Sequence, residues 1–332
     1  MHLARFPRVH LAHLPTPLEP MPRLSGLLGG PRLWIKRDDC TGLATGGNKT
    51  RKLEYLVADA LDQGCDTLVT VGAVQSNHCR QTAAAAAKVG LDCEILLERR
   101  VDDSSDVYEN SANVFLDRLL GAQVSFFPGG HDMKAELIAH GQRLEATGAR
   151  PYLIPGGGSN AVGALGYVQC ALETLRQADD LGLVIDHVVM ATGSTGTQAG
   201  LVVGFTGSGS GVPVLGISTR HPEATQIANV KRLVDQTTAH MGLPEVDVEH
   251  VLVNDEYVGG GYGVPTESMV EAVRMAAQTE AVLLDPVYTG KGMAGLIGLV
   301  RAGHFDPDAN VVFLHTGGSV GLFAQESLFD GA

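Results

Sequence analysis

The chain has 332 residues, a length that suits two modest α/β domains or one large one. Hydrophobic residues make up 44% and charged residues 18%, values that exclude a disordered chain, a collagen-like repeat and a coiled coil. The net charge is −13, and the acidic residues are scattered along the chain, so neither nucleic acid nor an anionic membrane is expected as a partner. We expect a small-molecule ligand instead.

The five cysteines form no CxxC pair and leave one over, which favours a reducing compartment over a disulfide scaffold. The N-terminal segment carries charges and prolines where a signal peptide needs an apolar core, and the sequence has no apolar run long enough for a membrane span. We therefore expect a cytoplasmic protein that does not enter a membrane. The histidines form no HxxE or HxH cluster, so no metal site is expected.

Short apolar runs alternate with segments of helical periodicity, which predicts a parallel sheet flanked by helices. The expected strands are Thr67–Val71, Cys93–Leu97, His187–Met190, Val214–Ile217 and Val311–Leu314. The expected helices are Asn48–Gly64, Asn77–Gly90, Glu109–Gly121, Ala161–Ala178 and Thr266–Thr279. The Gly- and Ser-rich stretch Thr206–Gly211 is expected to be a connecting loop.

The first of three Gly-rich turns, Thr45–Lys52, follows the strand-like run Leu33–Arg37 and opens a helix. It departs from a Walker A motif because Asn48 stands between Gly47 and Lys49. A helix dipole disfavours a cation at the helix start and so lowers the pKa of Lys49. That suits a lysine that reacts as the neutral amine, such as a Schiff-base lysine, but a solvated or anion-binding lysine fits the same residues.

The second turn places Gln75, Ser76, Asn77 and His78 between a strand and the start of a helix. One Ser or Asn is enough to cap a helix. Four hydrogen-bonding side chains beside exposed amide groups favour a site that holds a substrate carboxylate.

The third turn, Gly193-Ser194-Thr195-Gly196-Thr197, directly follows the strand His187–Met190. Its glycines allow a close approach of the backbone, and its hydroxyls lie beside the amides of a helix N-terminus. The turn contains no lysine and lacks G-x-G-x-x-G spacing, so it suits a monophosphate better than a dinucleotide, with a merely tight turn as the alternative.

Tyrosines stand beside glycines or turn residues in Gly261-Tyr262-Gly263 and in Asp285-Pro286-Val287-Tyr288-Thr289. A tyrosine can donate a proton or pack a cofactor, and it is equally a common half-buried structural residue. The last strand runs into His315-Thr316-Gly317-Gly318, whose polar groups can reach the same crevice.

Taken in this order, these segments resemble the fold-type II pyridoxal-phosphate family that contains D-cysteine desulfhydrase, L-cysteate sulfo-lyase and 1-aminocyclopropane-1-carboxylate deaminase. The resemblance covers nearly the whole chain. It is carried by Leu14–Leu18, Ile35–Asp39, Gly46–Lys49, Gln75–Asn77, Thr192–Thr197, Gly261–Gly263, Asp285–Tyr288 and His315–Gly318.

The resemblance implies an α/β fold with two open, twisted, mainly parallel sheets flanked by helices, as in the tryptophan synthase β chain. Residues 1–54 and 165–332 would form a larger domain that binds pyridoxal 5'-phosphate, and residues 55–164 a smaller domain on the substrate side. It also implies a homodimer.

The same resemblance implies the residue roles. The catalytic residues would be Lys49, Ser76, Tyr262 and Tyr288, with Lys49 as the Schiff-base lysine. The cofactor would be held by Lys49, Asn48, Asn77, Gly193, Ser194, Thr195, Gly196, Thr197 and Thr316. The substrate would be bound by Gln75, Ser76, Asn77, His78 and Thr289.

Two positions narrow the expected reaction. In the deaminase of this family a Glu and a Leu occupy the places of Thr289 and Thr316. A Thr hydroxyl hydrogen-bonds a ring nitrogen without keeping it protonated, which leaves the cofactor a weaker electron sink. That disfavours the deaminase, whose substrate must break a carbon-carbon bond.

The resemblance therefore predicts an α,β-elimination on a three-carbon sulfur amino acid. The preferred substrate is L-cysteate, giving pyruvate, sulfite and ammonia, because several segments look closer to the cysteate enzymes. The alternative is D-cysteine, which gives sulfide in place of sulfite. For a sulfonate, His78, Arg220 and Thr289 are the candidate donors. A non-catalytic binder of a phosphorylated ligand stays open as a different class of function.

Overall fold

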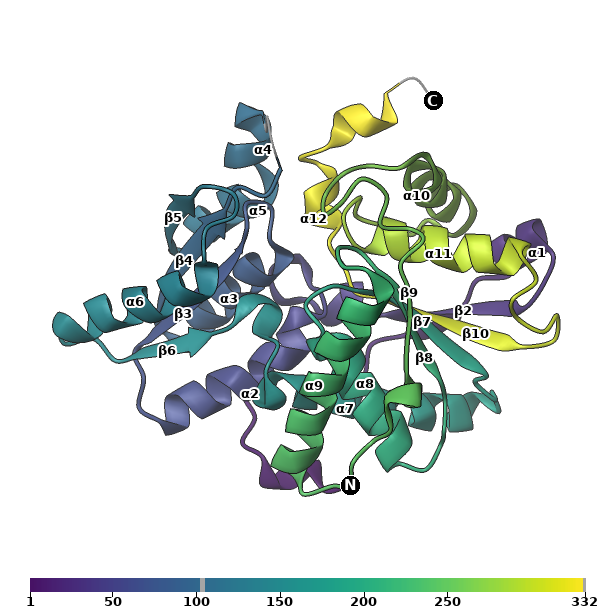
Figure 1. Ribbon diagram of the computed structural model, residues 1–332, viewed down its shortest axis with the longest axis horizontal. Helices are drawn as coiled ribbons and strands as arrows, with labels where there is room; N and C mark the ends of the chain where they lie inside the picture. The colour runs from purple at the N-terminus through teal and green to yellow at the C-terminus, as the bar shows by residue number, and fades with distance from the viewer. Residues whose placement is uncertain (102–104, 331–332) are drawn as a thin grey trace.

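The computed structural model describes residues 1–101 and 105–330. Its strands form two sheets that lie in separate lobes (Figure 1). The larger sheet has the order β1-β2-β10-β7-β8-β9, and the smaller sheet the order β5-β4-β3-β6. All strand pairs recorded in the two sheets are parallel except β1 with β2. The expected fold class, two mainly parallel sheets flanked by helices, is confirmed.

The strands of the larger sheet are β1 (Leu18–Pro20), β2 (Arg32–Arg37), β7 (His187–Thr192), β8 (Val214–Ser218), β9 (Val251–Asn254) and β10 (Asn310–His315). Those of the smaller sheet are β3 (Thr67–Ala73), β4 (Asp92–Glu98), β5 (Gln123–Phe127) and β6 (Pro151–Ile154). All five expected strands are present. The larger sheet therefore takes its strands from both ends of the chain and the smaller sheet from its middle. The exact domain boundaries, near residues 54 and 164, stay a prediction.

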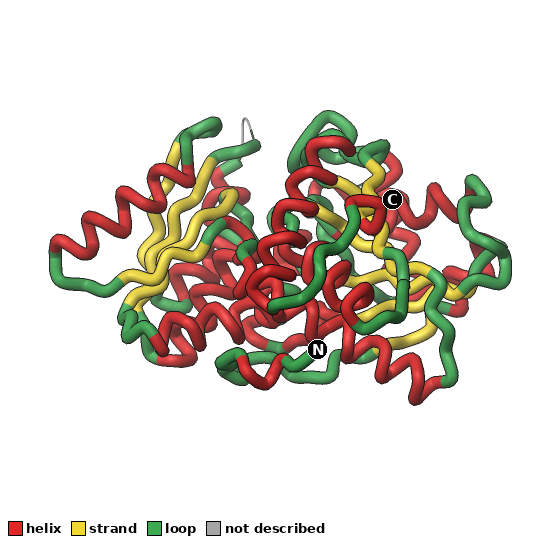
Figure 2. Tube along the Cα trace, turned by 60° about the horizontal axis from the view of Figure 1, so that its bottom comes forward, coloured by secondary structure: helices red, strands yellow, loops and turns green. Residues whose placement is uncertain are grey.

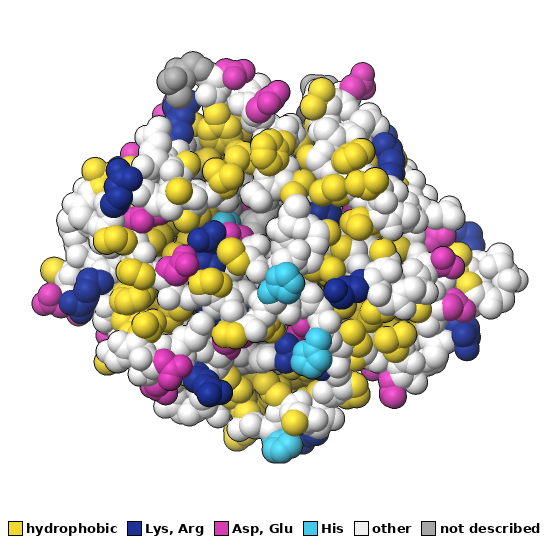
Figure 3. Space-filling view, turned by 180° about the vertical axis from the view of Figure 1, so that it is seen from behind, with side chains coloured by type: hydrophobic (Ala, Val, Ile, Leu, Met, Phe, Trp, Pro, Cys, Tyr) yellow, Lys and Arg dark blue, Asp and Glu magenta, His cyan; other side chains and the backbone are white. Residues whose placement is uncertain are grey.

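The helices are α1 (Pro22–Leu28), α2 (Lys49–Asp62), α3 (Asn77–Val89), α4 (Asp106–Asn110), α5 (Ala112–Leu119), α6 (Met133–Ala146), α7 (Ala161–Leu181), α8 (Gly196–Gly207), α9 (Glu223–Met241), α10 (Glu267–Glu280), α11 (Thr289–Arg301) and α12 (Ser319–Leu322). Helices cover both faces of the larger sheet, and α2 and α7 pass between the lobes (Figures 1 and 2). In the space-filling view from behind, the lobes part at one edge (Figure 3). Among the described residues, no helix has the length and apolar character needed to cross a bilayer.

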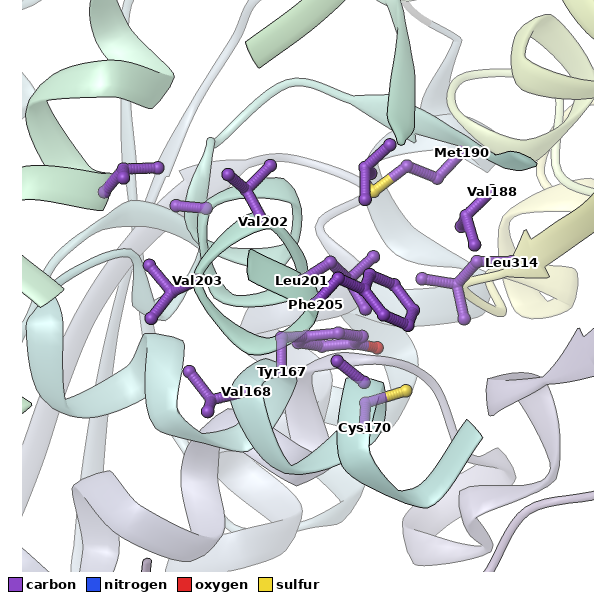
Figure 4. Close-up of a cluster of buried hydrophobic side chains, with 14 of the residues drawn as sticks. Tyr167, Val168, Cys170, Val188, Met190, Leu201, Val202, Val203, Phe205 and Leu314 are labelled. Atoms are coloured by element: carbon purple, nitrogen blue, oxygen red, sulfur yellow. The ribbon is translucent and has the colours of Figure 1, made fainter. Parts of the chain in front are cut away.

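The helix that carries the third turn is fixed by close packing of α8 on α7. A Cβ at Gly200 would lie 2.4 Å from the Ala164 carbonyl oxygen, and one at Gly204 would lie 2.5 Å from Ala171 Cβ. Only glycine permits so short a separation between the two helices. Tyr167 and Phe205 fill the core beside this contact (Figure 4). The N-terminus of α8 therefore has a fixed position at the end of β7.

Two expectations about local structure were wrong. The segment Glu109–Gly121 is not one helix, because α4 ends at Asn110 and α5 starts at Ala112, whose φ is +52°. The side-chain amide of Gln75 donates to the carbonyls of Tyr108 and Ser111. Those carbonyls are thereby withdrawn from a continuous helix. In the expected loop Thr206–Gly211, the first two residues instead form the last turn of α8.

Candidate active site

The three Gly-rich turns meet in one cleft of about 360 Å³. The walls come from the start of α2, from the turns after β3 and β7, and from the segment after β10. In an open α/β sheet, ligands bind where parallel strands end, and these turns follow the carboxyl ends of their strands. A more open hollow of about 670 Å³ lies over α10, far along the chain from these turns and without their converging donors. The cleft is therefore the candidate site.

Lys49 is the first residue of α2, and its Nζ lies 3.0 Å from Asn48 Oδ1. Burial lowers the pKa of Lys49 to about 8, with Asp285 opposing the shift and Arg80 adding to it. The direction matches the expectation, but burial is the main cause rather than the helix dipole. About a tenth of Lys49 is therefore the neutral amine at pH 7, far more than for an ordinary lysine, and this is the form that attacks a carbonyl.

The turn after β7 forms a cradle whose size and donors fit a phosphate. Gly193, Ser194, Thr195 and Thr197 line the cleft, and Thr195 has a φ of +72° just before α8. A Cβ at Gly157, across the turn, would lie 2.2 Å from Ser194 Oγ. The backbone thus closes around hydroxyl and amide donors at a helix N-terminus, an arrangement that fits a monophosphate. Gly196 does not line the cleft, because it faces Ser159 and Lys52.

Lys52 is a residue of this cradle that the sequence analysis missed. It is fully buried, its Nζ donates to the carbonyl oxygen of Gly157 at 3.0 Å, and a Cβ at Gly196 would lie 2.8 Å from that Nζ. The third turn contains no lysine, but α2 supplies one. The spacing of Lys49 and Lys52 was the available signal, because residues three apart lie on the same face of a helix.

The turn after β3 both caps α3 and lines the cleft. Ser76 Oγ accepts a hydrogen bond from the Cys79 amide at 3.2 Å, and Ser76, Asn77 and His78 are all on the cleft wall. His78 Nε2 lies 2.7 Å from Thr70 Oγ1. Burial, with Lys49 and Lys52 nearby, lowers the pKa of His78 well below its usual value. The ring is therefore neutral, which argues against His78 as a charged partner for a sulfonate.

Two predicted substrate contacts do not lie on the cleft wall. Gln75 faces the α4–α5 junction, and its Oε1 accepts from the Asn113 amide at 3.0 Å. Thr289 is fully buried, where its hydroxyl donates to Asp285 Oδ1 at 2.7 Å and accepts from the Asp285 amide at 2.8 Å. The hydrogen-bonding groups of both side chains are occupied by the protein. The expectation that they bind the substrate is therefore corrected, because these contacts give both residues structural roles.

Tyr262 and Tyr288 form a hydrogen-bonded pair at the cleft wall. Their hydroxyl oxygens are 2.8 Å apart, and Tyr288 lines the cleft while Tyr262 lies behind it. Burial raises the pKa of both phenols. Each hydroxyl therefore keeps its proton, and the pair can donate one to a group in the cleft.

Thr316 and Gly317 close the wall that faces Asn77. The Thr316 carbonyl accepts from the Asn48 amide at 3.0 Å, which ties the end of β10 to the turn carrying Lys49. A Cβ at Gly318 would lie 2.8 Å from both Asn77 Nδ2 and Asp285 Oδ1. Asn77 and Thr316 both line the cleft with Lys49, so both offer hydrogen-bonding side chains to a ligand held there.

The mouth of the cleft is cationic although the protein is acidic. Arg100, Arg220 and Arg232 line it, beside His221, whose pKa is lowered by burial and by the nearby arginines. Arg100 pairs with Glu98 and has its guanidinium 5.6 Å from the centre of the Tyr262 ring. Within residues 1–101 and 105–330, the recorded ion pairs include neither Arg220 nor Arg232. The mouth therefore offers charge to an anionic ligand.

A buried lysine with a lowered pKa lines the same cleft as a turn that fits a monophosphate. This combination is expected of an enzyme that binds a phosphorylated cofactor through a lysine. The chain belongs to the family of pyridoxal-phosphate dependent enzymes, whose model matches residues 9–317. It is 47% identical over 323 residues to the D-cysteine desulfhydrases of Salmonella typhi and of Salmonella newport strain SL254, with 97% of this chain and 97% of each relative covered.

Solved structures agree with this membership. A crystal structure described as an ACC deaminase homologue has a TM-score of 0.88 and 35% identity, with 99% of each chain covered. A crystal structure of a threonine deaminase has a TM-score of 0.62 and 24% identity, with 91% of this chain and 92% of that chain covered, and shows the shared fold.

Proposed function

We propose that this protein is a carbon-sulfur lyase that catalyses α,β-elimination on a three-carbon sulfur amino acid, with D-cysteine as its substrate. The proposal rests mainly on the 47% identity to D-cysteine desulfhydrases over 97% of the chain. Those relatives support D-cysteine, the second of the two substrates expected from the sequence, better than L-cysteate. The reaction converts D-cysteine and water to pyruvate, hydrogen sulfide and ammonia.

In this proposal the cradle and the lysines hold the cofactor. Ser194, Thr195, Thr197 and Lys52 would bind its phosphate, and Lys49 would bind it covalently. When bound, pyridoxal phosphate supplies an electron sink for negative charge at the substrate α-carbon. Thr316, which lines the cleft, would offer its hydroxyl to the ring nitrogen, and a neutral ring nitrogen suits elimination of a good leaving group.

The protein's own groups then handle the protons. Ser76 and the amides at the start of α3 would bind the substrate carboxylate. Nζ of Lys49 would take the α-proton as the neutral amine, a role that its lowered pKa favours. The hydroxyl of Tyr288, hydrogen-bonded to Tyr262, would donate a proton to the departing sulfur.

L-cysteate is the second candidate, and the cationic mouth favours it. A sulfonate is a permanent anion with three acceptor oxygens, and Arg220 is a cation on the cleft wall outside the recorded ion pairs of the described residues. The leaving group would then be sulfite, with pyruvate and ammonia unchanged. The deaminase reaction is disfavoured by Thr316, whose hydroxyl does not keep a ring nitrogen protonated.

One comparison separates these candidates. The purified enzyme is incubated with D-cysteine, L-cysteate or 1-aminocyclopropane-1-carboxylate, and pyruvate, sulfide, sulfite and 2-oxobutyrate are measured. We expect pyruvate and sulfide from D-cysteine at the highest kcat/KM. Sulfite release from L-cysteate with little turnover of D-cysteine would replace the first candidate by the second.

The matched variant Arg220→Gln adds a control. It should leave kcat/KM for D-cysteine within about twofold, because a thiol leaving group presents no permanent anion. It should lower kcat/KM for L-cysteate at least tenfold if Arg220 binds the sulfonate, since a charge-assisted hydrogen bond contributes about 1.5–3 kcal/mol.

The homodimer and the cytoplasmic location expected from the sequence belong to the same proposal. Light scattering on the purified protein tests the first, because a homodimer has twice the 34.8 kDa mass of the chain. A single species at the monomer mass would contradict it.

A further inference from the structure

Arg80 is a buried cation next to the cleft that the proposed mechanism does not use. It lies on α3 one turn after Asn77, is 0% exposed, and does not line the cleft. Burying a guanidinium is costly unless its donors are satisfied. Nη1 and Nη2 are hydrogen-bonded, whereas Nε has no partner among the described residues, so the bonds of the two Nη atoms show what the residue does.

The guanidinium joins three segments around the active site. Nη2 donates to the Gly46 carbonyl at 2.6 Å, in the turn that presents Lys49. Nη1 donates to Asn77 Oδ1 at 3.0 Å and to Asn113 Oδ1 at 2.6 Å, the latter on α5. Arg80 thus bridges the lysine turn of one lobe to two helices of the other.

These bonds fix which end of the Asn77 amide faces the ligand. A guanidinium has donors only, so the Asn77 atom next to it must be the carbonyl oxygen. The amide nitrogen of Asn77 then points to Gly318, where a Cβ would meet it at 2.8 Å. Asn77 is thereby held as a hydrogen-bond donor toward the cleft, the orientation needed for an acidic oxygen on a cofactor ring.

The charge of Arg80 is not cancelled by a bonded carboxylate. Its recorded acceptors are a backbone carbonyl and two side-chain amides. Asp117 on α5 faces it, but neither Asp117 oxygen has a hydrogen-bond partner among the described residues. Burial raises the pKa of Asp117 to about 8, so this carboxyl is largely neutral near pH 7. The positive charge of Arg80 therefore persists.

That charge acts on Lys49. Arg80 lowers the pKa of Lys49 together with burial, whereas Asp285 raises it. Lys52 on α2 and His78 on α3 also face Lys49, and the pKa values of both are lowered. The His78 ring is therefore neutral near pH 7. Arg80 is the cation whose charge lowers the pKa of Lys49 against the effect of Asp285.

We propose that Arg80 is a positioning residue of this active site, which orients Asn77 toward the cofactor and keeps the Lys49 amine reactive through its charge. The inference rests on the proposed cofactor site and adds two separable roles. Its hydrogen bonds orient Asn77, and its charge acts on Lys49. Lysine in its place keeps the charge and loses the forked geometry, while glutamine loses both.

The first experiment measures Lys49 in the protein without cofactor. The apoprotein is reacted with cyanate across pH 6–11, and carbamylation of Lys49 is followed by peptide mass spectrometry. Arg80→Gln should move the midpoint to higher pH, whereas Arg80→Lys should keep it. The matched control Arg118→Gln removes an exposed arginine that also faces Asp117, and should leave the midpoint unchanged.

The second experiment measures affinity for pyridoxal phosphate by titration. Arg80→Lys and Arg80→Gln should both weaken binding about tenfold, because each frees the Asn77 amide to rotate. In the background Asn77→Ala, the change Arg80→Lys should have little further effect. Circular dichroism checks that each variant is folded.

An unchanged Lys49 midpoint in folded Arg80→Gln, or additive losses of affinity with Asn77→Ala, would overturn the proposal. If Arg80→Gln does not fold, Arg80→Lys decides, and either a raised midpoint or unchanged cofactor affinity contradicts it. Neither readout needs turnover, so failure of the proposed lyase reaction is distinguishable from failure of this inference.

Discussion

Lys49 and Lys52 lie one helical turn apart on α2 and are given different roles by their surroundings. Within the described residues, Asn48 is the one recorded hydrogen-bond partner of Lys49 Nζ, and burial lowers the pKa of Lys49 to about 8. Lys52 lies beside the cradle, where burial and the charge of Lys49 lower its pKa well below the usual value. A bound phosphate would favour the charged form of Lys52. We infer that the first lysine is the nucleophile and the second an anion-binding group.

Lys52→Met should therefore weaken binding of pyridoxal phosphate by about 10- to 100-fold, the loss expected for a charge-assisted hydrogen bond. Fluorescence titration of the apoprotein measures this. Pyridoxal, which lacks the phosphate, serves as the control and should bind the variant and the parent protein alike. Equal losses for both ligands would show that Lys52 supports the site in another way.

At the scale of elements, α5 carries a buried carboxyl, that of Asp117, with no hydrogen-bond partner among the described residues. Asp117 is 0% exposed, and burial raises its pKa from 3.8 to about 8, with Arg80 and Arg118 only partly opposing the shift. Between these two values the native state holds a proton that the unfolded chain releases. The free energy of unfolding therefore falls as pH rises through this window, by about 1.4 kcal/mol per pH unit.

Asp117→Asn removes this titration while keeping the size of the side chain. The variant should gain stability relative to the parent protein as pH rises from about 4 to 8, with the difference levelling off above about pH 8. Urea unfolding at a series of pH values measures it. A difference that does not change with pH would mean that Asp117 is ionised in the native protein.

The helices and strands show which parts of the structure follow from local sequence signals. The helices α6, α9 and α11 were not among the predicted elements. Five strands and the helices α2, α3, α7 and α10 were predicted because apolar period and capping residues are local signals, as with Ser76 at the start of α3. The break at Ala112 was not, because it depends on Gln75, a residue that is distant in sequence. The same holds for Gln75 and Thr289 in the site, whose partners are known only from the tertiary structure.

At the scale of the whole molecule, a buried ionic network joins segments from both halves of the chain. Arg51 on α2 bonds both oxygens of Asp38, after β2, at 2.9 Å each. It also reaches Glu173 on α7 at 2.8 Å, and Glu173 pairs with Lys36 of β2 at 2.6 Å. This network holds α2, and so Lys49, against the larger sheet.

Arg51→Met should cost about 3–5 kcal/mol of unfolding free energy, because it leaves Asp38 and Glu173 without their main partner. The control Arg301→Gln breaks an exposed pair with Glu271 and should cost less than about 1 kcal/mol. Denaturant unfolding compares the two. A small loss for Arg51→Met would show that the network is not a main tie between these segments.

The sequence motifs predicted the meeting of the three turns in one cleft, since each follows a strand of a parallel sheet. Of the cations around the cleft they named Arg220 as a candidate, but they did not predict Lys52, Arg80, Arg100 or Arg232. Those side chains come from the faces of helices and from strand ends in two lobes, and their convergence depends on how the lobes pack.

The most direct test of the proposed active site asks which lysine binds the cofactor. The holoenzyme is reduced with borohydride, digested, and the pyridoxyl-bearing peptide is identified by mass spectrometry, with Lys49→Ala as the control. We predict the label on Lys49. A lysine-bound cofactor absorbs at about 410–430 nm, and we predict that Lys49→Ala loses this absorbance. A label on Lys52, or retention of that absorbance in Lys49→Ala, would contradict the assignment.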